Sequence, residues 1–363
     1  MRLKEAVLRV ARSLGAFALA RDSAWRSKRL LIVCWHGVTT GDEHEWNPSM
    51  YITQERLRER LRGLRDGGYN VLPLANAVER LYDGTLPPRS IALTFDDGAT
   101  DFERLAVPVL REFNMPATVY LTTYYCNARF PVFDVILTYV IWKGRNSGAD
   151  LAPLCESPVP LPVAGDADRK RTRKALHDFA TARKLSAAEK NAFVTRVAAS
   201  LGVDYDDIMA RDVMAIMTPD AVRGLPADLV DVQLHTHRHR TPRDAALFAR
   251  EIEDNAAEIR TLRGEDATLD HFCYPSGVYY GEFLPWLREQ GVRYATTCLP
   301  DLATRDTEPL LIPRFVDAMT QPAVVFEAWA SGFAALMPRR RIYRLDATRL
   351  AVAPQHSTAG ASA

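Results

Sequence analysis

The segment "IALTFDDGAT" (residues 91–100) leads an apolar run directly into two adjacent carboxylates and a glycine. Five residues of strand-forming character precede Asp96 and Asp97, which predicts a buried strand that ends at the pair. Two like charges side by side in a half-buried place destabilise each other. The segment therefore requires partners from elsewhere in the chain to offset this repulsion.

Apolar runs that end in polar residues recur along the sequence, and they occupy 29–37 ("RLLIVCWHG"), 228–237 ("DLVDVQLHTH") and 269–277 ("LDHFCYPSG"). Amphipathic helical patterns lie between the runs, over 53–68, 243–264 and 281–292. Alternating strands and helices predict an α/β fold with a parallel sheet or barrel. In such folds the chemistry gathers at the carboxyl ends of the strands. The polar strand ends therefore predict one shared site.

Composition restricts the class of protein. The chain has 363 residues, of which 47% are hydrophobic and 25% charged, and its formal net charge is +1. These values are typical of a soluble globular protein, and the charge gives no general attraction to nucleic acid. The five cysteines are spread out and form no CxxC pair, so the sequence indicates neither a disulfide framework nor a thiolate zinc knuckle, and it mildly favours a reducing compartment.

Residues 1–28 are predicted to form an amphipathic N-terminal helix. Ala18, Leu19 and Ala20 resemble a signal-peptide cleavage box, but Arg9 and Arg12 interrupt the apolar core that a signal needs. We therefore expect a retained helix, which either packs on the domain or lies at a membrane surface. This favours a cytoplasmic protein with peripheral membrane contact over an exported one.

The rest of the chain divides by composition. We expect one barrel over residues 29–320, interrupted by a mainly helical insertion over 127–222. A C-terminal helical extension is predicted over 321–350, and a disordered tail over 351–363.

Three histidines, His235, His237 and His239, lie within five residues of "QLHTHRHRTP" (233–242). A pair at i and i+4 on a helical turn shares one face, as a zinc site requires, whereas strand geometry would put all three on one side. A polar strand end with solvated histidines is an equally simple interpretation. The spacing alone leaves these interpretations open.

The segments "TFDDG" (94–98), "HTHRH" (235–239) and "FCYPSG" (272–277) occur in that order. Together they resemble the first three motifs of the NodB-type polysaccharide deacetylases, carbohydrate esterase family 4. The similarity runs from about residue 30 to 315, with the insertion set aside. The resemblance implies a distorted (β/α) barrel, and a metal-dependent hydrolase that removes N-acetyl groups from amino sugars of a surface polysaccharide or its precursor.

The resemblance also implies roles for individual residues. Asp97, His235 and His239 would bind a divalent metal, and Asp96 would be the general base. His237 falls at a variable position. Zinc is the first choice for a set of two histidines and one aspartate, although iron, cobalt or nickel could substitute. The cation would offset the repulsion between the two adjacent aspartates.

The general acid departs from the common family pattern. A late Leu-x-His motif usually supplies it, but the corresponding segment "EPLLIPRF" (308–315) contains no histidine. The segment "VCWHGV" (33–38) is similar to an early histidine motif of the circularly permuted poly-N-acetylglucosamine deacetylase subgroup. This similarity implies that His36 is the acid. The alternative is a structural histidine that packs the strand end.

Two further roles are implied by "FCYPSG". Cys273 stands where an arginine often contacts the catalytic aspartate, and Arg314 of "IPRF" is a candidate to replace that arginine. Alternatively, Arg314 pairs with a surface carboxylate. The family uses a main-chain N–H at the tyrosine position, here Tyr274, as an oxyanion donor.

The implied substrate is an N-acetylated glycan or a lipid-linked sugar. Hydrolysis of a non-sugar amide or of an O-acetyl ester is a second possibility on the same fold. A catalytically silent carbohydrate-binding relative is a third, because the late histidine is missing. The sequence specifies neither the sugar nor the oligomeric state.

Overall fold

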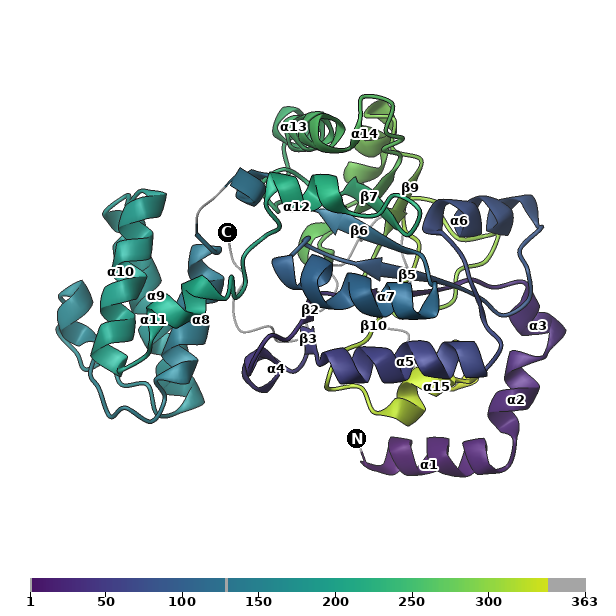
Figure 1. Cartoon of the computed structure of the whole chain (residues 1–363), viewed down its shortest axis with the longest axis horizontal. Helices are drawn as coiled ribbons and strands as arrows, with labels where there is room; N and C mark the ends of the chain where they lie inside the picture. The colour runs from purple at the N-terminus through teal and green to yellow at the C-terminus, as the bar shows by residue number, and fades with distance from the viewer. Residues whose placement is uncertain (1, 128–129, 339–363) are drawn as a thin grey trace.

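The computed structural model of the chain describes residues 2–127 and 130–338. Its centre is a parallel sheet (Figure 1). The strand order is β10-β1-β5-β6-β7-β8-β9, and β4 also pairs with β5. The strands are β1 (Leu31–Trp35), β4 (Asn70–Val71), β5 (Ser90–Phe95), β6 (Ala117–Leu121), β7 (Val230–Leu234), β8 (His271–Cys273), β9 (Tyr294–Thr296) and β10 (Phe315–Val316). A separate pair joins β2 (Gly37–Val38) to β3 (Tyr51–Ile52).

The sheet bends until its two edges meet. Thr296 at the end of β9 forms a parallel bridge with Ile312, and Phe315 a few residues later pairs with Val33 of β1. The segment 312–316 thus joins both edges of the sheet. The expected distorted (β/α) barrel is confirmed. It departs from a regular barrel where β9 and β10, which are short, close the sheet.

The predicted helices are present, with ends that their sequences explain. They are α5 (Gln54–Asp66), α13 (Ala245–Arg263) and α14 (Phe283–Glu289). The Thr53 hydroxyl accepts a hydrogen bond from the Arg56 N–H, so it caps α5. Three more helices belong to the barrel: α6 (Leu74–Asp83), α7 (Val107–Phe113) and α12 (Pro219–Gly224).

Both faces of the central strands are buried. Every residue of β1 and β5 is buried, as expected for a parallel sheet that is covered on both sides. Leu31, Val33 and Trp35 belong to the same core cluster as Leu57 and Leu61 of α5, whereas Ile32 packs in a second cluster with α6. This burial holds the strand ends, and the residues that follow them, in fixed positions.

A helical lobe stands beside the barrel (Figure 1). It consists of α8 (Phe133–Lys143), α9 (Asp166–Ala182), α10 (Ala187–Leu201) and α11 (Tyr205–Ala210). The lobe has a hydrophobic core of its own, built from residues between Ile136 and Val213. The insertion expected over 127–222 is mainly helical, but its last part differs, because α12 packs against α13 of the barrel.

The N-terminal segment consists of three helices instead of the single one expected over 1–28. These are α1 (Arg2–Ser13), α2 (Ala16–Arg21) and α3 (Ala24–Ser27). Gly15 separates α1 from α2 with a φ of 79°, a left-handed conformation that ends the first helix. Within the described residues, no helix combines the length and the apolar character that a bilayer crossing requires.

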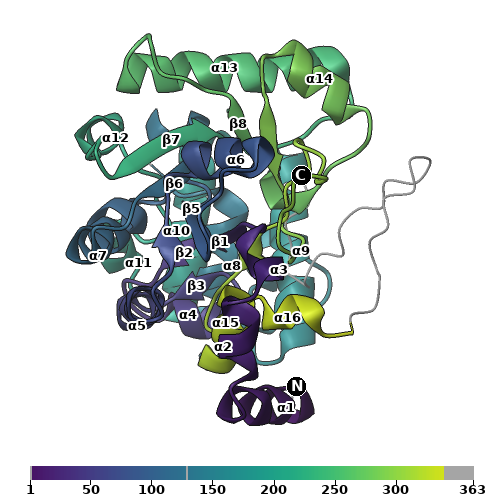
Figure 2. The ribbon, with the colours of Figure 1, turned by 90° about the vertical axis from the view of Figure 1, so that its right-hand side faces the viewer.

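The C-terminal extension contains α15 (Ala323–Ala330) and α16 (Phe333–Leu336). In Figure 2, α1 lies at the edge of the molecule, next to α2 and close to α15, whereas α16 packs on α2 and α15. The rest of the predicted extension, and the tail predicted over 351–363, lie outside the described residues.

Candidate active site

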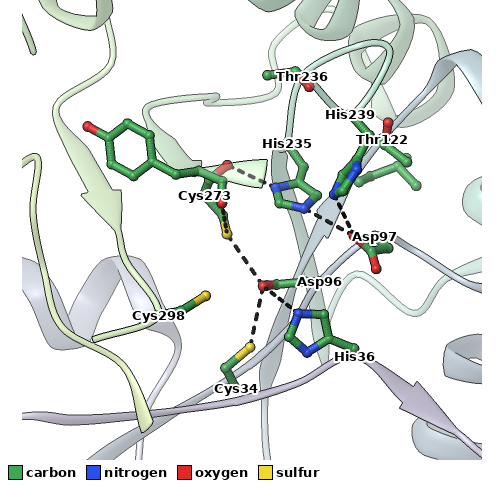
Figure 3. Close-up of polar contacts among 12 residues, drawn as sticks. Cys34, His36, Asp96, Asp97, Thr122, His235, Thr236, His239, Cys273 and Cys298 are labelled. Carbon is green, nitrogen blue, oxygen red and sulfur yellow. Dashed lines mark hydrogen bonds and ion pairs between the residues drawn. The ribbon is translucent and has the colours of Figure 1, made fainter. Parts of the chain in front are cut away.

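The carboxyl ends of four neighbouring strands bring the predicted residues together (Figure 3). His36 follows β1, the pair Asp96–Asp97 follows β5, and His235 begins the loop after β7. Tyr274 directly follows β8. Because these strands are parallel and adjacent in the order β1-β5-β6-β7-β8, their ends lie at one edge of the barrel.

Three of these side chains form a set that fits a metal ion. The Asp97 Oδ1 atom lies 3.2 Å from His235 Nε2 and 3.1 Å from His239 Nε2. A tetrahedral zinc site with bonds of about 2.0–2.1 Å places its ligand atoms about 3.3 Å apart, so the spacing fits such a site. The three ligand atoms come from two loops that are separated by more than 130 residues of sequence.

Hydrogen bonds fix the ligands in the form that binds a cation. His235 Nδ1 donates to the Cys273 carbonyl over 2.9 Å, so Nε2, which lies 3.2 Å from Asp97 Oδ1, is the ring nitrogen that could bind a cation. Burial alone would raise the pKa of Asp97, but the two imidazoles hold it well below its ordinary value. Asp97 is therefore a carboxylate, the charge state that a metal ligand needs.

His237 is not part of this set. Its Nδ1 atom lies 2.8 Å from the Thr123 hydroxyl, away from Asp97. The structure thus selects His235 and His239, at i and i+4, among the interpretations that the spacing left open. It does not support the arrangement with all three histidines on one side.

The site loops carry strained backbone. Asp97, Thr236, His239 and Ser276 all have positive φ angles, between 54° and 70°. Such conformations are costly for residues other than glycine and persist where surrounding contacts enforce them. Gly98 has a φ of 78°, a left-handed conformation that favours glycine, and a Cβ there would also lie 2.3 Å from Leu121 Cδ1. The "DDG" turn therefore directs Asp97 at the histidines only with glycine in third place.

Asp96 has a different partner from Asp97. Arg314 binds both oxygens of its carboxylate, at 2.7 Å each, and both side chains are almost fully buried. This burial excludes the alternative of a surface salt bridge for Arg314. Burial by itself would raise the pKa of Asp96, but Arg314, followed by His36, lowers it below its ordinary value. Asp96 is therefore ionised.

Cys273 makes room for this arginine. Its Sγ atom lies 3.0 Å from Arg314 Nη2 and 3.5 Å from Asp96 Oδ2, and Cys34 Sγ lies 3.4 Å from the same oxygen. Burial raises the pKa of both thiols well above the ordinary value. Protonated thiols donate weak hydrogen bonds to Asp96 and are poor nucleophiles.

His36 lies beside Asp96, with 3.7 Å between its Nε2 atom and Asp96 Oδ2. Its Nδ1 atom is buried and has no hydrogen-bond partner among the described residues. Its side chain is 16% exposed, so one part of the ring can meet a ligand. The geometry places His36 where the predicted acid would be needed, and its role stays a prediction.

The orientation of Tyr274 differs from the predicted one. Its N–H donates to the Thr296 carbonyl over 3.4 Å, in the ladder between β8 and β9. The carbonyl of the same peptide unit, that of Cys273, faces His235. Because N–H and C=O of a trans peptide point in opposite directions, the Tyr274 N–H points away from His235. This geometry does not support Tyr274 as an oxyanion donor.

Tyr124 is a neighbour of the site that the motifs do not indicate. Its side chain is 50% exposed, and its N–H donates to the His237 carbonyl over 2.8 Å. The rings of Tyr124 and His237 are perpendicular, with 5.5 Å between their centres, and the Arg238 guanidinium lies 5.6 Å from the centre of the Tyr124 ring. Tyr124 follows the end of β6 by three residues, at the same edge of the barrel, and this position in the sequence could have indicated that it lies near the site.

Comparison with known families gives a partial match. Residues 83–147, which include Asp96, Asp97 and α8, match the family described as polysaccharide deacetylase. Over 101 residues, the chain is 32% identical to poly-β-1,6-N-acetyl-D-glucosamine N-deacetylase of Escherichia coli strain K12. That alignment covers 28% of this chain and only 15% of the E. coli protein.

Solved structures extend the likeness to most of the chain. IcaB from Ammonifex degensii superimposes with a TM-score of 0.53 at 16% identity, over 84% of this chain and 97% of that one. The deacetylase PplD from Streptococcus pyogenes gives a TM-score of 0.52 at 16% identity, over 80% and 93%. At these identities the likeness concerns the fold.

Proposed function

We propose that the barrel of this chain is a NodB-type polysaccharide deacetylase domain, and that it acts as a metal-dependent N-deacetylase of an N-acetylated amino sugar. One observation carries the proposal: two adjacent aspartates are both ionised but have different partners. Asp97 faces His235 and His239, whereas Asp96 is bound by Arg314. Such a division provides one carboxylate as a metal ligand and one as a base.

Asp97, His235 and His239 would hold the metal. Three protein ligands leave a position free, which is the mark of a catalytic site. When bound there, a divalent ion polarises a carbonyl and lowers the pKa of water towards neutrality. Zinc suits this ligand set best, and iron, cobalt and nickel are the alternatives.

The residues of the chain would move the protons. Asp96 takes a proton from the attacking water, whose oxygen bonds to the acetamide carbon. The carbon–nitrogen bond then breaks, and His36 gives a proton to the departing amine. The products are acetate and the free amino sugar. Arg314 keeps Asp96 ionised and in place, so that it is ready to accept the proton.

The substrate we propose is a glycan or a lipid-linked sugar with an N-acetyl group. The exposed ring of Tyr124 beside the His237 loop supplies an aromatic surface of the kind on which sugars stack. Non-sugar amides and O-acetyl esters are the alternative substrates. A silent binding module is less favoured, because binding alone requires neither a buried ionised base nor a set of metal ligands beside it.

Metal analysis combined with acetate release from N-acetylglucosamine oligomers tests the proposal. We expect one metal per chain, loss of activity with a chelator and recovery when zinc is added back. Asp97→Ala should lose the metal. Asp96→Asn should keep the metal and lose at least about a hundredfold in rate, as expected for removal of a general base. His36→Gln should also keep the metal with a reduced rate.

Three outcomes would contradict parts of this proposal. A protein that binds metal but releases no acetate from sugar, peptide or ester substrates would be a silent module. Turnover of acetylated peptides or O-acetyl esters alone would replace the substrate class. Full activity of His36→Gln would show that His36 is not the acid, and would leave the proposed metal ligands and the base role of Asp96 unaffected.

A further inference from the structure

Exposed apolar side chains gather on the N-terminal helices. Among the described residues, eight large apolar side chains are exposed; three of them belong to α1 and α2, and a fourth lies in the turn between these helices. These are Val7, Val10, Leu14 and Leu19, with exposed fractions of 46, 58, 77 and 76%. We refer to these four as the N-terminal apolar face. A fifth, Leu336, belongs to α16, which packs against α2 through Phe17 and Phe333.

The helix that carries this face is fixed to the protein by its other side. Leu8 is fully buried in the main core, and Ala11 packs against that core. Arg12 forms an ion pair with Glu327 of α15 at 3.0 Å. Val7, Val10 and Leu14 are spaced i, i+3 and i+7, so they share the side of the helix that this packing leaves free. The apolar face is therefore kept in a fixed position on the protein.

The charge around this face is strongly one-sided. Residues 1–30 contain eight lysines and arginines but only two acidic residues, whereas the whole chain has 46 basic and 45 acidic residues. The basic excess of the protein thus lies in this segment, and the remainder of the chain is net acidic. Lys4 and Arg9 are exposed on α1, and Lys28 is exposed directly after α3.

We propose that the N-terminal apolar face docks α1 and α2 on the surface of a bilayer that contains anionic lipid. Apolar residues on one side and flanking basic residues are the features of helices that lie in the membrane interface. Basic residues near an anionic surface add attraction that salt weakens. None of the described helices is suited to cross a bilayer, which agrees with a surface position.

A second copy of the chain fits this face less well. A two-fold dimer would place the same patch on both sides of the interface, and thereby bring two basic segments together. An anionic lipid surface instead compensates the charge. The inference does not rest on the proposed enzymatic function, because no residue of the candidate active site belongs to this face.

Co-sedimentation of the full chain with lipid vesicles tests the docking. We expect binding to vesicles of phosphatidylcholine with phosphatidylglycerol, weak binding to phosphatidylcholine alone, and less binding at high salt. Leu14→Glu should weaken binding about tenfold or more, because it removes apolar contact and adds repulsion. Lys4→Glu combined with Arg9→Glu should reduce the preference for anionic vesicles.

Leu247→Glu is the matched control, because Leu247 is 49% exposed but lies on α13 of the barrel. It should bind vesicles like the wild type, and thermal melting should show that each variant is folded. The proposal is overturned if the wild type binds no anionic vesicles or if Leu14→Glu binds equally well. It is also overturned if sedimentation shows a wild-type dimer that Leu14→Glu converts to a monomer. Asp97→Ala should keep vesicle binding, which separates this test from that of the active site.

Discussion

Arg314 makes two adjacent aspartates chemically unequal. It binds both oxygens of Asp96 in a buried pair, whereas Asp97 turns to His235 and His239 through a left-handed backbone. The repulsion between the neighbours is thus offset twice, by a guanidinium for one and by imidazoles for the other. A metal ion bound by these three residues would supply the second part of this compensation in place of the protons on the imidazoles.

Replacing Arg314 by methionine should change the pH dependence of the activity. Without the guanidinium, burial would dominate and raise the pKa of Asp96. Asp96 acts as a base only when it is ionised, so activity would be lost at low pH. We expect the acid limb of the kcat/KM profile to move to higher pH, with metal content unchanged.

A second substitution provides the control. Cys273 touches the same guanidinium, and an arginine at 273 could reach Asp96 from the other side. Cys273→Arg in the Arg314→Met background should therefore move the acid limb back towards that of the wild type. An acid limb that is the same in Arg314→Met as in the wild type would show that Asp96 is not the titrating base.

At the scale of elements, the helical lobe depends on close packing between α8 and α10. Gly144 follows α8, and a Cβ at this position would lie 2.5 Å from Leu201 Cβ. Gly144→Ala should therefore force the helices apart and lower the free energy of unfolding by about 1–3 kcal/mol. Denaturant unfolding measures the loss, and hydrogen exchange should locate it in α8 and α10.

Gly63 provides the opposite case within the barrel. It lies inside α5, and a Cβ there would meet no atom within 4 Å. Gly63→Ala should raise the free energy of unfolding by roughly 0.5–1 kcal/mol, because alanine loses less backbone entropy in a helix. Equal and small effects of both substitutions would show that Gly144 is not a tight contact.

The sequence predicts elements where the signal is local. The ends of β5 and α5 follow from an apolar run before Asp96 and from the cap at Thr53. The break at Gly15 was missed because the apolar spacing continues through it. The direction of the Tyr274 N–H could not be predicted either, since it depends on pairing between β8 and β9. The contact of Arg314 with Asp96 joins positions more than 200 residues apart, so the family resemblance, and not spacing, suggested it.

At the scale of the whole molecule, the candidate metal site connects distant parts of one core. Asp97 precedes the helical lobe in sequence, and both histidine ligands follow it. The lobe has its own hydrophobic core, separate from the clusters that surround the barrel strands. A ligand that binds Asp97, His235 and His239 would therefore stabilise the barrel directly. It would stabilise the lobe only through the contacts between lobe and barrel.

Zinc should accordingly raise the melting temperature of the barrel. A ligand present at a hundredfold excess over its Kd stabilises the folded state by about 2.7 kcal/mol, which corresponds to a shift of several degrees. Calorimetry of the wild type with zinc or with chelator measures this shift, and His239→Ala should remove it. If lobe and barrel unfold in separate transitions, only the barrel transition should move. If a single transition moves, lobe and barrel unfold together. Contacts between them, such as the ion pair of Lys143 with Asp42, are then strong enough to couple the two cores. No shift in any transition would mean that the three ligands hold no zinc, and the proposed hydrolase would lose its metal.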